Sequence, residues 1–375
     1  MAWSEVTVEE QRREFVSIAG NEGSNVRELC RRYAISPTTG YKWLGRWAQG
    51  ERLLEDRSRR RLTQPQRTAA EIEGQVLAVR DAHEMWGGRK IRKVLEREGV
   101  LELPSPSTIT EILRRHGRLI PSTTYRGPFI RFERAAPNEL WQMDFKGDVA
   151  LFTGARCYPL TVLDDHSRFA LAIRACANQQ STTVARQLRA IFRCYGLPQA
   201  MLMDNGSPWS GGPGYPFTRL TVWLIRLGIT VAHGRPYHPQ TQGKDERFHR
   251  TLKAEAIGSR VWRDLGSAQR EFDRWRKVYN FERPHQALKL EVPATRYRAS
   301  ARSFPETLPA IEYGSDDQVR KVQRNGELYF RGRSVQVGKA FAGLPVALRP
   351  TAVDGRFAVF CCHQSIALID LHRRA

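Results

Sequence analysis

The sequence predicts a chain of three parts: an all-α N-terminal region, a central α/β core with a mixed sheet, and a small all-β barrel toward the C-terminal end. Apolar residues recur at helical spacing through the first third of the chain. Alternating and continuous apolar segments typical of strands begin near residue 138, and short strand-like segments separated by turns follow residue 311. We expect domains at 1–50, 69–118, 138–300 and 311–372, with basic linkers at 51–68 and 119–137.

Residues 1–50 are predicted to form short helices around a tight turn. The last of these helices begins at Ser36 and Pro37, a capping residue followed by proline at the first helical position. Two short helices of which the second is basic and aromatic are typical of a helix-turn-helix unit, although a three-helix bundle without a DNA role is the alternative. We assign DNA contact to Thr38, Thr39, Tyr41, Lys42 and Arg46.

Residues 69–118 repeat this pattern, with helices expected at 69–82, 88–98 and 105–117. The last of them opens with Ser105-Pro106, just as the earlier one opens with Ser36-Pro37. We therefore predict a second helix-turn-helix unit in tandem, with Ser107 and Thr108 in contact with DNA.

Residues 138–300 change in character, with strands expected at 140–149, 157–163, 169–175 and 200–203 and helices at 182–195, 218–227, 245–256 and 267–280. Antiparallel strands followed by alternating helix and strand predict a mixed α/β sheet. The polar segment 164–168 joins the second and third strands, so we interpret Asp164 and Asp165 as residues of a hairpin turn.

The segment 311–372 contains short strand-like runs separated by charged or glycine-containing turns. Asn325-Gly326 and Asp354-Gly355 are strong hairpin signals, because both central positions of the tight turn need positive φ. This pattern predicts the small β-barrel.

Three carboxylates of the core lie where chemistry can use them. Asp144 is within the first strand, and Asp204 directly follows a buried strand, at the sheet edge where α/β proteins gather ligands. Glu246 begins a helix and shares one face with Arg250 and Lys253, which we assign to DNA phosphates. Taken singly, each acid is more often a turn former or a solvated helix residue. Together they suit two Mg²⁺ ions, which clamp the attacking and leaving oxygens of a phosphodiester.

Asp148 and Asp245 are the nearest alternatives to these acids. Asp148 follows Gly147 toward the end of its strand, so we do not place it in the site. Asp245 points about 100° away from Glu246 around the helix, so that only one of the two can face the metals.

The charge balance favours a polyanionic partner, since 60 Lys and Arg residues against 39 Asp and Glu residues give a formal net charge of +21. The six cysteines show no CxxC pair, and we interpret them as reduced thiols without a metal: Cys30, Cys157, Cys176, Cys194, Cys361 and Cys362. No apolar signal core or long apolar segment is present, so we expect a soluble cytoplasmic protein with no membrane partner.

At these residues the chain resembles the bacterial insertion-sequence DDE transposases, whose catalytic core is of the retroviral-integrase type. The matching motifs, in family order, are WQMD at 141–144, DDHSR at 164–168, MDNGS at 203–207, HPQTQGKDERF at 238–248 and NFERPHQAL at 280–288. Each motif is weak alone, but the ordered set is specific. The tandem helix-turn-helix units and the β-rich tail also resemble this group, so the resemblance covers nearly the whole chain.

The resemblance implies an RNase H-like core in which Asp144, Asp204 and Glu246 form the catalytic triad and bind two Mg²⁺ ions, with Mn²⁺ able to substitute. Gln242 and Lys253 fall on positions that contact DNA in integrases, and we add Lys244 of the same motif. The 41 residues between Asp204 and Glu246 exceed the usual spacing in related elements, and the glycine-rich loop 211–216 accommodates the extra length.

The implied reaction has two steps at one site. Water cleaves DNA at the element's end, and the freed 3′-hydroxyl then attacks target DNA. The helix-turn-helix units would bind the terminal inverted repeats, and joining two ends implies at least a dimer on DNA. Two alternatives stay open: a catalytically silent helix-turn-helix regulator, which the three intact carboxylates oppose, and a nuclease of the same fold that does not join DNA, which the tandem recognition units oppose.

Overall fold

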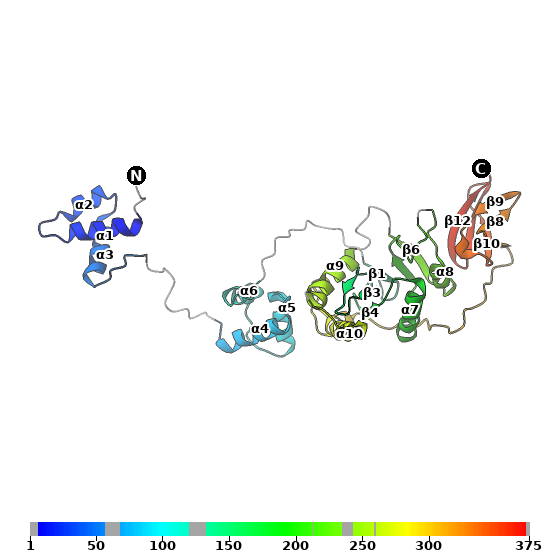
Figure 1. Ribbon diagram of the computed structural model, residues 1–375, viewed down its shortest axis with the longest axis horizontal. Coiled ribbons are helices and arrows are strands. Elements are labelled where there is room, and N and C mark those ends of the chain that lie inside the picture. Colours follow the sequence, from blue (N-terminus) through cyan, green and yellow to red (C-terminus); the bar gives the residue numbers. More distant parts are fainter. Residues whose placement is uncertain are drawn as a thin grey trace. The chain divides into compact units, whose positions relative to one another are not determined.

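A computed structural model of the chain describes residues 7–56, 68–119, 133–212, 214–234, 243–258 and 260–372. The chain divides into two compact units, 1–67 and 68–375, which are described separately (Figure 1). The finer domain boundaries within the second unit stay a prediction. None of the helices in the described ranges is long and apolar enough to cross a membrane.

The first unit contains α1 (Val8–Ala19), α2 (Val26–Arg32) and α3 (Pro37–Ala48). Ser36 caps α3, and its side chain accepts a hydrogen bond from the backbone N–H of Thr39 at 3.1 Å. Gly40 allows α3 to pack closely, because a Cβ at this position would lie 2.4 Å from Cys30 Sγ. The helices therefore form the predicted helix-turn-helix arrangement.

A second helical block opens the second unit, with α4 (Ala70–Ala82), α5 (Gly88–Arg97) and α6 (Pro106–Arg115). Ser105 caps α6 as Ser36 caps α3, since its side chain accepts from the N–H of Thr108 at 3.1 Å. The block is tied to the following core by an ion pair of 3.0 Å between Arg97 and Glu291, and Val278 packs against its apolar interior.

The core contains a mixed sheet, as predicted. Among the described residues the strand order is β2-β3-β1-β5-β6, with β4 paired to β3. β1 pairs antiparallel with β3, whereas β1–β5 and β5–β6 are parallel. The strands are β1 (Leu140–Phe145), β2 (Val149–Ala150), β3 (Arg156–Asp164), β4 (Ala170–Cys176), β5 (Ala200–Met203) and β6 (Thr230–His233).

Helices cover both faces of this sheet (Figure 1). One face packs against α7 (Ser181–Tyr195) and α8 (Arg219–Arg226), through a buried cluster that includes Trp141 of β1. The other packs against α9 (Gly243–Leu252) and α10 (Leu265–Phe281), where Phe248 and Phe272 are buried.

Asn280 of α10 is expected to be a strong determinant of stability. Its amide is fully buried, its Oδ1 accepts from the N–H of Ala170 at 2.8 Å, and its Nδ2 donates to the Ala170 carbonyl at 3.0 Å. Asn280→Ala would leave both backbone groups without this partner in the interior, so we expect a loss of about 2–4 kcal/mol in denaturant unfolding. Gln269→Ala is the control, because Gln269 clamps β4 in the same way from a half-buried position and should cost about 1 kcal/mol. Equal losses would contradict this reasoning.

The C-terminal part is all-β, as predicted, and its strands form two antiparallel sheets. One sheet has the order β12-β11-β10-β7, and the other pairs β8 with β9. Gly355, with φ +72°, lies between the paired strands β10 and β11, as its hairpin signal predicted. Gly326 has φ +88° in the turn before β8, but Asn325 is not at positive φ, and β7 and β8 pair with β10 and β9, so the tight Asn-Gly hairpin predicted there is not found. The strands are β7 (Gln318–Lys321), β8 (Glu327–Phe330), β9 (Arg333–Gln336), β10 (Pro345–Pro350), β11 (Arg356–Cys361) and β12 (Gln364–Asp370).

Candidate active site

Asp144 and Asp204 lie at the carboxyl ends of two neighbouring inner strands of the core sheet, β1 and β5. In the parallel pair of β1 and β5, Gln142 stands opposite Leu202, and each aspartate comes two residues later on its own chain segment. Burial, followed by the charge of Asp204, raises the pKa of Asp144 to about 6, although the Phe145 N–H donates to Asp144 Oδ1 at 2.7 Å and opposes this shift. The topology therefore brings together two acids that are 60 positions apart in the sequence.

Glu246 occupies the exposed face of α9. Arg250 of α9 and Lys253, which begins the π-helix η2 (Lys253–Ile257), are exposed too, whereas Phe248 and Leu252 are buried, which agrees with the predicted division of faces. In the described ranges, no group of three or more Asp, Glu, His or Cys side chains is placed to hold a metal ion. The structure thus brings the two aspartates to the ends of neighbouring strands, and the place of Glu246 beside them stays a prediction.

Asp245 is the acid of α9 that turns inward. Its side chain is buried, and its Oδ1 has no hydrogen-bond partner in the described structure. Burial first, and then the charges of Asp144 and Asp165, raise the pKa of Asp245 well above its usual value. Asp245 was not predicted to belong to the site, yet the charge of Asp144 contributes to the raised pKa of Asp245, so the two carboxyl groups interact.

His249 is a neighbour of Asp144 that sequence reasoning missed. Its Nδ1 lies 3.8 Å from Asp144 Oδ2, and its Nε2 lies 2.8 Å from the Thr161 hydroxyl. Burial, followed by the charge of Lys146, lowers the pKa of His249 to about 3, so the imidazole is neutral at physiological pH. The available signal was its helical spacing: His249 follows Asp245 by four residues and so shares the inward face of α9.

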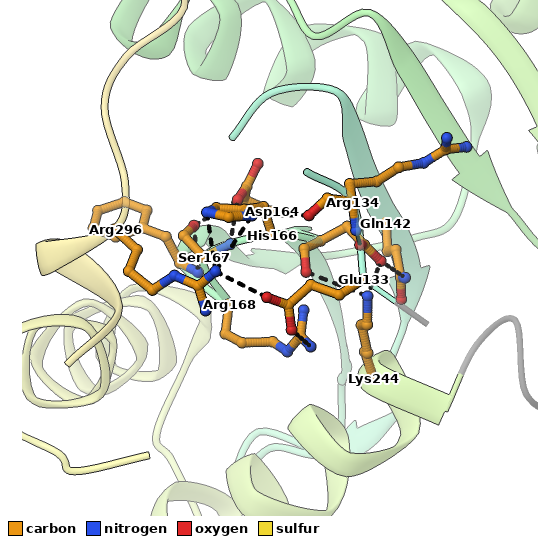
Figure 2. A network of polar contacts seen from close by, with 11 residues as sticks. Glu133, Arg134, Gln142, Asp164, His166, Ser167, Arg168, Lys244 and Arg296 are labelled. Atoms are coloured by element: carbon orange, nitrogen blue, oxygen red, sulfur yellow. Dashed lines mark hydrogen bonds and ion pairs between the residues drawn. The ribbon is translucent and has the colours of Figure 1, made fainter. Parts of the chain in front are cut away.

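The end of β3 and the turn after it contain two buried aspartates with different roles (Figure 2). Asp164 accepts from the N–H of Ser167 at 2.8 Å and from the N–H of Asn138 at 2.7 Å, so it closes the turn as predicted. Asp165 instead forms an ion pair with Lys244 of α9. Burial, followed by the charge of Arg168, lowers the pKa of Lys244 to about 8. Asp165, which the sequence predicted only as a turn residue, therefore also connects the turn to the distant helix α9.

Known families match the chain along most of its length. A "Helix-turn-helix domain" matches residues 11–61 and a "Homeodomain-like domain" matches 39–113. An "Integrase core domain" matches 134–239 and 227–293, and an "IS481 family transposase, C-terminal domain" matches 317–375. The order of these matches follows the all-α, α/β and all-β parts of the fold.

An "Insertion element IS407 uncharacterized 31.7 kDa protein" of Burkholderia multivorans is 31% identical over 242 residues, which span 61% of this chain and 84% of that protein. The chain belongs to the bacterial insertion-sequence transposases with an integrase-type core. The transposase is also 30% identical over 169 residues to an "Insertion element IS476 uncharacterized 39.2 kDa protein" of Xanthomonas euvesicatoria, over 44% of this chain and 46% of the other. Among solved structures, the catalytic core domain of BIV integrase matches with a TM-score of 0.32 and 21% identity, over 42% of this chain and 92% of that one.

The residues assigned to DNA contact differ in how exposed their side chains are in the transposase. On α3, Arg46 is buried and its Nε donates to Glu51 at 2.7 Å, so its guanidinium is engaged within the unit. Lys244 is engaged with Asp165, and Gln242 lies outside the described residues. Thr39 is half-buried, and the remaining assigned side chains are exposed: Thr38, Tyr41, Lys42, Ser107, Thr108, Arg250 and Lys253.

Asp144→Asn is expected to stabilise the metal-free transposase near neutral pH. The pKa of Asp144 in the folded chain is about 6, above the usual 3.8, so the stability linked to its proton is present at acidic pH and lost as the pH rises through about 6. Removing the charge should raise the free energy of unfolding by on the order of 1–2 kcal/mol at about pH 7.5, after allowing for the partial exposure of the group to solvent. Thermal unfolding at about pH 7.5 and about pH 4.5 tests this, since the gain must shrink at the lower pH. The same gain at both pH values would rule out the carboxylate charge as the cause.

Proposed function

We propose that the transposase cleaves DNA at the ends of its element and joins the freed 3′-hydroxyl to target DNA, with Asp144, Asp204 and Glu246 as the catalytic carboxylates. The observation that carries this proposal is that Asp144 of β1 and Asp204, directly after β5, follow the paired positions Gln142 and Leu202 of two parallel strands by two residues each. Burial, and then the charge of Asp204, raise the pKa of Asp144. Two acids held together at a sheet edge repel each other, and a bound cation removes that repulsion. Glu246 enters the proposal through the family motif and its place on α9.

The donor set fits divalent metal ions of the Mg²⁺ type, with Mn²⁺ as a substitute. Carboxylate oxygens are the ligands that Mg²⁺ prefers, and Asp144 is only partly shielded, with 29% of its side chain exposed. Two such ions would supply activation of the attacking oxygen and stabilisation of charge on the leaving oxygen. Asp144 and Asp204 would hold them from the sheet, and Glu246 from α9. The neutral imidazole of His249 adds no positive charge to compete with them.

DNA contact is proposed for the exposed faces of the helical units and of α9. The second helix of each helix-turn-helix unit, α3 and α6, would enter the major groove at the terminal inverted repeats. Tyr41 and Lys42 on α3 and Ser107 and Thr108 on α6 are exposed, which supports this assignment. Arg250 and Lys253 lie on the face of Glu246 and would hold phosphates beside the reacting bond.

The active assembly is proposed to be at least a dimer on DNA, because the reaction joins two element ends to one target. The net charge of +21 supports salt-dependent binding to the DNA backbone beyond the recognition sites. On this basis we place the protein in the bacterial cytoplasm, in association with the nucleoid.

The test incubates the full-length protein with oligonucleotides bearing the ends of its own element, a target duplex, and Mg²⁺ or Mn²⁺. Joined products in a metal-dependent reaction are the expected result. Binding without cleavage would favour a silent helix-turn-helix regulator instead. Cleavage without joining would favour a nuclease of the same fold.

A further inference from the structure

Asp165 links three separate segments of the second unit through one buried carboxylate. It is 0% exposed, and it accepts hydrogen bonds from the N–H of Arg134 at 2.8 Å and from Gln142 Nε2 at 2.7 Å. Asp165 also forms an ion pair with Lys244, which lies in the first turn of α9, 79 positions further along the chain. The strand β1, the segment that enters the core, and the helix that follows residues 235–242 thus share a single anchor.

The turn itself does not require this carboxylate. Asp164 closes the turn through Ser167, while Asp165 directs its side chain to other segments. Its partner Lys244 is also enclosed, with 14% of its side chain exposed. A buried charge of either sign without its partner is strongly unfavourable, so the pair restricts where the first turn of α9 can lie.

The entering segment is fixed by the same cluster. Glu133 accepts from Arg168 at 3.1 Å and from Arg296 at 2.9 Å, and Arg296 also lies 3.1 Å from the His166 ring (Figure 2). These contacts hold the backbone of residues 133 and 134 against the turn. The segment that donates to Asp165 is therefore itself bound by several polar contacts to the turn and to Arg296.

The rotation of α9 about its axis decides which acid faces the two aspartates. At about 100° per residue, Asp245 and Glu246 point in different directions, and Glu246 lies about 60° from His249. His249 already approaches Asp144 to 3.8 Å. Exchanging one acid for the other near the two aspartates would therefore take a rotation of about 100°, so a contact that fixes the first turn of α9 fixes which acid points inward.

We propose that Asp165 and Lys244 are positioning residues, which pin the first turn of α9 and so set the placement of Glu246 relative to Asp144 and Asp204. This inference rests on the proposed function for its consequence in catalysis. Neither residue touches the reacting atoms in this proposal. The pair acts through the helix that it holds.

Asp165→Asn and Lys244→Gln in the full-length protein test the proposal, with Glu306→Gln as the matched control. Glu306 also loses an ion pair, the 2.8 Å contact with Arg193, but that pair is exposed and belongs to other segments. The first readout is hydrogen exchange without metal or DNA. Both test variants should exchange about tenfold faster in α9 and unchanged in α10, and the control should match the wild type in both helices.

The second readout is the Mg²⁺ concentration that gives half-maximal cleavage. It should rise about tenfold or more in both test variants, with activity partly recovered at high Mg²⁺ and DNA affinity unchanged. A merely structural role would lower activity equally at all metal concentrations. Unchanged exchange in α9, or equal acceleration in α9 and α10, would overturn the proposal. If the wild type joins no DNA, the proposed function fails, while hydrogen exchange still decides whether the pair anchors α9.

Discussion

Asp144→Asn is expected to abolish both cleavage and joining, by at least about a thousandfold, because Asp144 is one of the carboxylates proposed to bind the metal ions. Asparagine keeps the size of the side chain but loses the negative charge that a divalent cation requires. The affinity for element-end DNA should stay within about twofold, because the helical units that bind it are elsewhere in the chain. Product formation on end oligonucleotides and a binding titration with the same DNA measure the two effects.

Asp148→Asn is the matched control for this experiment. Asp148 is close to Asp144 in sequence, but it is paired with Arg156, and both side chains are well exposed. The same chemical change there should leave activity within about twofold, since exposed ion pairs contribute little. An Asp144→Asn protein with a tenth or more of the wild-type rate would remove Asp144 from the metal site.

The pairing of Asp144 with Asp204 was predictable because it follows from regular structure. Apolar alternation located the first strand, and an apolar run located the strand before Asp204. Parallel neighbours place their carboxyl ends at one edge, so topology alone brings the two acids together. The division of α9 into an exposed face with Glu246 and a buried face with Phe248 follows in the same way from helical periodicity.

The contacts between distant segments could not be read from periodicity. Asp165 belongs to a motif that indicates a turn, and nothing local shows that its carboxylate meets Lys244. His249 reaches Thr161 across 88 positions for the same reason. Such pairs depend on how far apart the sheet and α9 lie and on the rotation of the helix, which are set by the packing of side chains such as Phe248 and Trp275.

Glu246→Gln should strongly reduce cleavage and Asp245→Asn should not, and comparing the two variants decides which acid of α9 binds the metal ions. Glu246 has the longer side chain and lies on the exposed face beside Arg250 and Lys253, where DNA has access. We expect Glu246→Gln to reduce cleavage by at least about a hundredfold with DNA affinity unchanged, as for the loss of a metal ligand. The measurement is single-turnover cleavage of end oligonucleotides at several Mg²⁺ concentrations.

Asp245→Asn should leave cleavage within about threefold and raise the thermal stability of the metal-free protein near neutral pH. Burial, and then the charges of Asp144 and Asp165, raise its folded-state pKa, so stability is lost as the pH rises above the usual pKa of the carboxyl, and an amide removes that loss. The reverse pattern, in which Asp245→Asn inactivates and Glu246→Gln does not, would make Asp245 the third ligand. In that case the acid already turned toward Asp144 would be the one that binds metal, and Asp165 and Lys244 would act by holding Asp245, not Glu246, beside the two aspartates.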